Sequence, residues 1–276
     1  MTATCRGGTT GPSNIDFGLT AAGALPAGDP RIQMQPRDVP VIQTNTQTEI
    51  ALGVLFPGGL DYRRADSDAR NDRYRLWEVP GASHVSNDSN APVITLQLNN
   101  AELEGILPSQ LAPVGCTHQL FVSGPATGIP GVVDPNNFPF SYVVNAAFDD
   151  LIKWIDFNLP PPRAERIEVT DTTPPTIAVD KFGNALGGVR TPFLDVPTAT
   201  YFPTDTVAHT TLFSGFCFLY GYNKPFSDAT LDSLYKNHFD YAVRVVLHSY
   251  VLVARGFWLP TDAQTVVKQA LQSDVP

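Results

Sequence analysis

The sequence predicts an α/β fold in which the last strands of a parallel sheet are followed by a C-terminal portion of loops and helices. Two short runs of largely apolar and β-branched residues, 39–44 and 74–79, have the length and composition of strands buried on both faces. Amphipathic helical spacing is confined to the second half of the chain. The 25 prolines and 21 glycines among 276 residues indicate many ordered loops between these elements.

Each predicted strand is followed by polar residues. The strand at 39–44 leads into the polar stretch 45–49, which is predicted to be a loop, and the next apolar run stops at Pro57. The strand at 74–79 is closed by Pro80 and Gly81, and His84 lies just beyond its end. The sequence therefore places polar side chains after two strands that are predicted to lie in one sheet.

Three helices are predicted from apolar residues that recur every three or four positions. The first begins at Ser141, which can act as an N-cap, and must end before Pro160. A long helix is predicted from Ser227 to a stop at Gly256, and the last helix starts at Pro260. Short strands are expected at 166–169 and 176–180. The apolar face of the first helix is predicted to consist of Val144, Phe148, Leu151, Ile152 and Ile155.

Charge and hydropathy exclude two classes of partner. Eighteen basic residues against 27 acidic residues give a formal net charge of −9, and there is no basic run, so nucleic acid is not an expected partner. The most apolar stretch, 241–254, is interrupted by Arg244 and His248, so no membrane span is predicted. The first residues lack the pattern of a signal peptide, and no compartment is assigned.

Neither a metal nor a cofactor is predicted. Cys5, Cys116 and Cys217 lie far apart without a C-x-x-C pair, and the five histidines form no H-E-x-x-H pattern. The glycine-rich stretch 183–188 lacks the G-K-[ST] ending of a phosphate loop, and Pro192 follows it closely. Three cysteines also argue against a disulfide framework.

The best candidates for catalysis follow the two predicted strands. Glu49 comes after the first strand and His84 after the second. Because ligands of open parallel sheets bind beyond the carboxyl ends of the strands, the two side chains are expected to meet there. A carboxylate fixes the tautomer of a neighbouring imidazole and stabilises its charged form, which makes the imidazole a general base toward a hydroxyl group.

Other acidic residues are alternatives to Glu49. Glu78 lies in the same predicted strand as His84 and is expected to face sideways. Asp66 and Asp68, in the connecting loop, are reserve acids.

Five stretches of the chain resemble the α/β-hydrolase domain family. They are VPVIQTNTQTE (39–49), YRLWEVPGASH (74–84), VVNAAFDDLIKWIDFNLPPPRAERI (143–167), DKFGNALGGVRTPFLDVPTATY (180–201) and FCFLYGYNKPFSDATLDSLY (216–235). The resemblance extends from about residue 36 to the end and points to a subgroup with a large C-terminal portion. It implies the last strands of a hydrolase sheet, with serine-type ester hydrolysis of a small-molecule substrate as the activity. By position it implies His84 as the catalytic base and Glu49 as the acid that orients it.

The sequence departs from this family at the nucleophile. The family places its serine in a G-x-S-x-G turn before the acid, and no such pattern occurs in the chain. The 38 residues before Val39 have room for about one βα unit of roughly 30 residues. We therefore expect an irregular segment at 1–35, the C-terminal part of a hydrolase at 36–276, and a truncated chain that is inactive or impaired.

The sequence allows two further hypotheses about function. The chain could be a non-catalytic binding or scaffold remnant of a hydrolase, or Cys116 could replace the serine as nucleophile near His84. A sheet without its central strands would also expose an edge, so self-association is expected.

Overall fold

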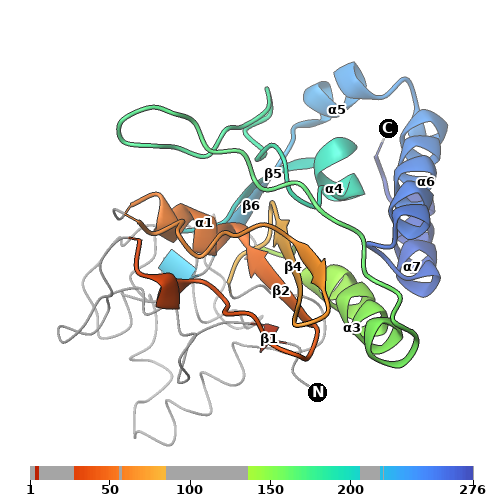
Figure 1. Cartoon of the computed structure of the whole chain (residues 1–276). Helices are drawn as coiled ribbons and strands as arrows, with labels where there is room; N and C mark the ends of the chain where they lie inside the picture. Colours follow the sequence, from red (N-terminus) through yellow and green to blue (C-terminus); the bar gives the residue numbers. More distant parts are fainter. Residues whose placement is uncertain are drawn as a thin grey trace, which may run out of the picture.

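The computed structural model describes residues 4–5, 28–55, 58–84, 136–205, 218–219 and 221–275. Its strands are β1 (Thr4–Cys5), β2 (Val41–Thr46), β3 (Ser67–Ala69), β4 (Asp72–Val79), β5 (Ala199–Phe202) and β6 (Tyr222–Pro225). Its helices are η1 (Pro30–Ile32), α1 (Gln47–Gly53), α3 (Phe140–Phe157), α4 (Pro192–Asp195), α5 (Asp228–Leu234), α6 (His238–Arg255) and α7 (Pro260–Leu271) (Figure 1).

The principal sheet has the strand order β1-β2-β4-β3. β2 and β4 pair in parallel from Val41 opposite Tyr74 to Thr46 opposite Val79, and β3 adds an antiparallel edge. The two predicted strands and their parallel pairing are confirmed. β2 begins and ends two residues later than predicted, and β4 begins two residues earlier and ends as predicted. Every residue of β2 and the last six of β4 are buried, which explains why both strands lack a polar alternation.

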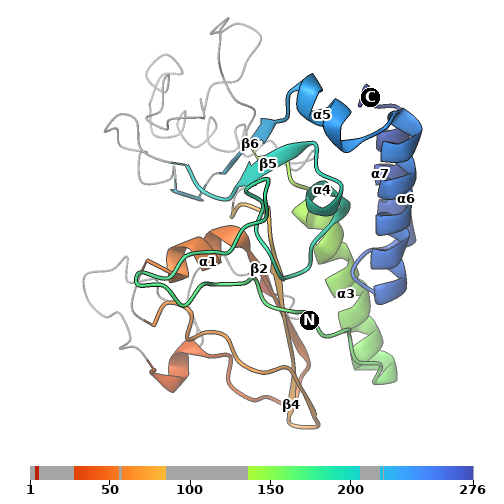
Figure 2. The ribbon, with the colours of Figure 1, turned by 90° about the horizontal axis from the view of Figure 1, so that it is seen from above.

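The two faces of this sheet pack into different clusters. Ile42, Trp77 and Val79 belong to the main core, which includes buried residues of α3, α6 and α7. Val41 and Tyr74 point to the opposite face and pack with Tyr62 in a smaller cluster. Figure 2 shows α3 and α4 near the sheet, with α6 and α7 side by side farther out. The carboxyl ends of β2 and β4 are thereby fixed between a helical layer and a loop layer.

The triple-proline segment after α3 is hydrogen-bonded to side chains of β4. Arg75 is buried, and its Nε donates a hydrogen bond to the carbonyl oxygen of Pro161 at 2.9 Å. The indole N–H of Trp77 donates to the carbonyl oxygen of Pro162 at 3.0 Å. A proline has no N–H but retains its carbonyl oxygen, so this segment can end a helix and still accept hydrogen bonds from a strand.

The first predicted helix is present, but its predicted apolar face is partly wrong. α3 buries Val143, Ala146, Ala147, Leu151 and Trp154. Of the predicted face, Phe148, Ile152 and Ile155 are each 46% exposed. α3 is apolar around much of its circumference, so the stripe predicted from the spacing is not the stripe that the tertiary structure buries. The helix begins at Phe140, with Pro139 rather than Ser141 as its N-cap residue.

Two other expectations about the second half also need correction. The helix predicted from Ser227 is two helices, because the chain turns at Tyr235 and α6 starts anew with Asn237 as its N-cap. Gly256 does end α6 in the left-handed conformation. The segments expected to be strands at 166–169 and 176–180 form isolated bridges instead, such as Val169 with Ile177. Within the described residues, no helix is long and apolar enough to cross a membrane.

Candidate active site

Glu49 lies in the first turn of α1, directly after β2, rather than in the predicted loop. Its carboxylate accepts a hydrogen bond from the backbone N–H of Thr46 at 2.7 Å and a second from the Thr46 hydroxyl. Thr46 is the N-cap residue of α1, and the two residues form a capping box. The side chain is 4% exposed, and these hydrogen bonds hold it in one orientation.

His84 lies just past the carboxyl end of β4, on the loop that begins at Gly81. Its backbone N–H donates to the hydroxyl of Thr48 at 3.0 Å, and that hydroxyl donates to the carbonyl oxygen of Pro203 at 2.5 Å. The imidazole is 24% exposed. The loop after β4 is thus tied to the first turn of α1 through backbone and side-chain contacts.

The structure brings the two predicted site residues together. Nδ1 of His84 is hydrogen-bonded to Oε1 of Glu49, while Oε2 of the same carboxylate is occupied by Thr46. A carboxylate on Nδ1 holds the proton there and leaves Nε2 as the basic nitrogen. Nε2 has no hydrogen-bond partner among the described residues.

Two buried side chains brace the histidine loop. The Gln47 side-chain oxygen accepts from the Gly81 N–H at 2.7 Å, and the backbone N–H of Gln47 donates to the Ala82 carbonyl at 3.0 Å. Asn136 Nδ2 donates to the Gly81 carbonyl at 2.8 Å and to the Ser83 hydroxyl at 2.7 Å. These hydrogen bonds fix the backbone on both sides of Ala82 and so set the position of the imidazole.

Gly221 makes room for this brace. A Cβ on Gly221 would lie 2.0 Å from both the Ser83 hydroxyl oxygen and the carbonyl oxygen of Phe202. The Gly221 carbonyl also accepts from the Asn136 N–H at 3.0 Å. Only a residue without a side chain allows so close an approach of the two loops.

The hydrogen bond with Glu49 raises the pKa of His84 above its ordinary value of 6.5, against the effect of burial, which lowers that pKa. The negative charge of Glu49 adds to the increase. A raised pKa in the folded state means that protonated His84 stabilises the fold fully below pH 6.5, and this contribution is lost as the pH rises through the folded-state pKa.

Replacing Glu49 by glutamine is expected to lower the pKa of His84, because only the opposing effect of burial would then remain. NMR titration of the imidazole resonances measures the change. Glu165→Gln is the matched control, since Glu165 is exposed and should leave the His84 pKa in place. An unchanged His84 pKa in Glu49→Gln would show that the two side chains do not interact in solution.

The alternative acids lie elsewhere and have other partners. Glu78 is fully buried and is bound by Arg63 and Tyr62. Asp66 accepts from Arg166 at 2.6 Å, and Asp68 accepts from Arg163 at 2.6 Å. Each of these carboxylates forms an ion pair with an arginine near β4, and none is hydrogen-bonded to His84.

Cys116 lies outside the described residues. His238, on α6, is hydrogen-bonded to the Val275 carbonyl at 2.9 Å and has the role of a structural histidine. Among the described residues, no three His, Cys, Asp or Glu side chains gather as metal ligands would.

The bracing residues were missed at the level of sequence. A signal existed for Thr46, because Thr46-x-x-Glu49 is the capping-box pattern that marks a helix start. Asn136 and Gly221 had none, since they are more than 50 residues from His84 in a chain without a repeated motif. Their roles depend on contacts that only the tertiary structure creates.

The comparisons with known proteins bear on the family. A family model described as an alpha/beta hydrolase domain matches residues 8–268. Comparison with curated proteins and comparison with solved structures each give no match. Because the match extends over most of the sequence, the chain belongs to the alpha/beta hydrolase domain family.

Proposed function

We propose that this chain supplies the histidine and acid of a serine-type ester hydrolase, with His84 as general base and Glu49 as its orienting acid. The hydrogen bond between His84 Nδ1 and Glu49 Oε1, at the carboxyl ends of two parallel strands, is the observation that carries this proposal. It is the relation of base and acid that activates a hydroxyl nucleophile in hydrolases of this kind.

The proposed chemistry takes place at Nε2 of His84. A serine hydroxyl hydrogen-bonded to Nε2 would give its proton to the imidazole as its oxygen attacks the carbonyl carbon of an ester. The imidazolium would then donate that proton to the departing alkoxide as the carbon–oxygen bond breaks. Glu49, hydrogen-bonded to Nδ1, would hold the ring in place and stabilise the imidazolium through both steps.

The nucleophile is not supplied by the neighbouring serine. Ser83 is 1% exposed, and its hydroxyl accepts a hydrogen bond from Asn136, so it belongs to the brace of the histidine loop. No G-x-S-x-G occurs in the sequence. We therefore propose that the 276-residue chain by itself does not hydrolyse esters through a serine.

An aryl ester assay tests this proposal. The purified chain is expected to release 4-nitrophenol from 4-nitrophenyl acetate no faster than its His84→Ala variant, and a fluorophosphonate probe should not label it. Turnover that is blocked by the probe and lost in His84→Ala would show that the chain carries its own serine nucleophile. The second test is to translate the DNA upstream of Met1 in the same reading frame and to search it for G-x-S-x-G. If that motif is absent upstream, a non-catalytic role is favoured.

A further inference from the structure

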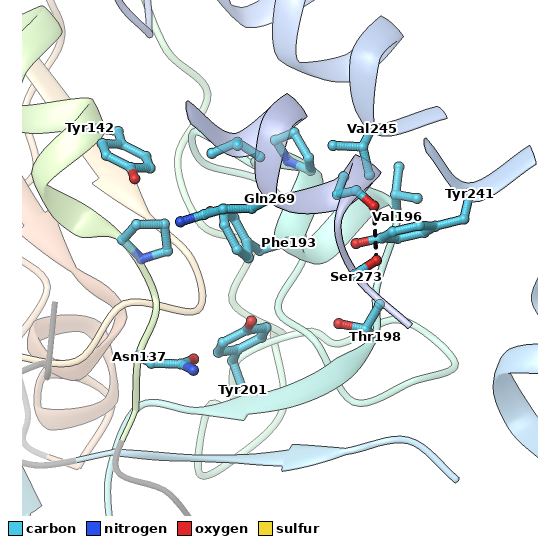
Figure 3. Close-up of a pocket in the computed structure, with 14 residues that line it drawn as sticks. Asn137, Tyr142, Phe193, Val196, Thr198, Tyr201, Tyr241, Val245, Gln269 and Ser273 are labelled. Carbon is cyan, nitrogen blue, oxygen red and sulfur yellow. Dashed lines mark hydrogen bonds between the residues drawn. The ribbon is translucent and has the colours of Figure 1, made fainter. Parts of the chain in front are cut away.

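The C-terminal half contains a cavity of about 390 Å³ that neither His84 nor Glu49 lines. It lies where the start of α3 meets α4, β5, α6 and α7 (Figure 3). A cavity of roughly 300–1,000 Å³ is the size that small-molecule sites of proteins have.

The walls of the cavity differ between its floor and its mouth. Buried Val245 and Val266 line the interior beside hydroxyl-bearing residues such as Thr198, whereas Asn137 and Gln269 are exposed. No lining residue carries a charge. A charged ligand would lose hydration here without gaining an opposite charge, so the walls favour a neutral molecule.

Tyr201 provides the polar contact inside. Only 5% of the residue is exposed, and the described residues contain no hydrogen-bond partner for its hydroxyl. Figure 3 shows its ring rising from β5 toward Phe193 and Gln269. Burial raises the pKa of Tyr201, so the hydroxyl stays protonated and can both donate and accept. A hydroxyl at the wall of a cavity can therefore exchange a hydrogen bond with water for one with a bound molecule.

We propose that this cavity binds a neutral small molecule that joins an apolar body to one oxygen atom that hydrogen-bonds to the Tyr201 hydroxyl. The apolar body lies against the interior valines and Phe193, and polar side chains surround it at the mouth of the cavity. This site is independent of the proposed ester hydrolysis at His84.

Equilibrium dialysis with 2-naphthol tests the proposal, since that molecule joins an apolar bicycle to one hydroxyl. The full chain is expected to bind it saturably. Gln269→Trp should weaken binding at least tenfold by blocking the mouth, while Gln264→Trp should bind like the unmodified chain, because Gln264 is exposed on the same helix but does not line the cavity.

Tyr201→Phe tests the polar contact without changing the shape of the cavity. It is expected to weaken 2-naphthol about threefold to tenfold, the effect of one hydrogen bond, and to leave the binding of naphthalene unchanged. His84→Ala should bind 2-naphthol normally. Binding that is absent, unaffected by Gln269→Trp, lost in His84→Ala, or tighter for the anion 2-naphthoate would overturn the proposal, without bearing on the role of His84 in hydrolysis.

Discussion

Replacing Glu78 by alanine is expected to lower the free energy of unfolding by about 3–5 kcal/mol, the usual cost of removing one partner from a buried ion pair. Glu78 is fully buried in β4 and accepts four hydrogen bonds. Two come from Arg63, at 2.8 Å to Oε1 and 2.7 Å to Oε2. The others come from the Tyr62 hydroxyl at 2.7 Å and the Ile167 N–H at 2.8 Å.

The size of this effect follows from what the alanine variant leaves behind. The guanidinium of Arg63 is 21% exposed and would keep its positive charge without a counterion. The phenol of Tyr62 and the N–H of Ile167 would lose their acceptor inside the protein, and an unsatisfied buried group costs about 1–3 kcal/mol. Burial raises the pKa of Tyr62, so the phenol remains a donor and cannot relieve the deficit by ionising.

Guanidinium chloride unfolding followed by circular dichroism measures this change. Glu165→Ala is the control, because it removes a glutamate that is exposed a few residues from Ile167 and should change the free energy by less than about 0.5 kcal/mol. Glu78→Gln keeps the volume and two acceptor sites, so it should fall between the two. A loss below about 1 kcal/mol in Glu78→Ala would mean that the pair contributes little to the fold.

The part of the site that sequence could predict is the part that local pattern controls. β2 and β4 are marked by continuous apolar runs because both of their faces are covered. Residues just beyond the ends of adjacent parallel strands must approach one another, so the sequence could predict that Glu49 and His84 meet.

The parts that could not be predicted depend on tertiary context. Glu49 is in a helix rather than a loop, because the capping contact with Thr46 starts α1 within a polar stretch. α3 carries large apolar side chains on more than one face, so periodicity could not choose between Trp154 and Phe148. The Asn136 brace joins segments that no local pattern connects.

If a longer form of this protein encodes a G-x-S-x-G strand before Met1, its ester hydrolysis is expected to depend on both members of the pair. His84→Ala should lower kcat by about 10⁴-fold or more, because the serine would lose its proton acceptor. Glu49→Gln should cause a loss of about 10⁴-fold with little change in KM, because glutamine no longer holds the proton on Nδ1 or stabilises the imidazolium.

The matched controls separate chemistry from folding in that experiment. His238→Ala removes a half-buried histidine that is hydrogen-bonded to the Val275 carbonyl, so it should keep its kcat. Because Glu49 raises the pKa of His84, the acidic limb of the pH profile of kcat/KM should move to lower pH in Glu49→Gln. A kcat for Glu49→Gln close to that of the unmodified enzyme, with an unshifted profile, would remove Glu49 from the mechanism even if His84 proved essential.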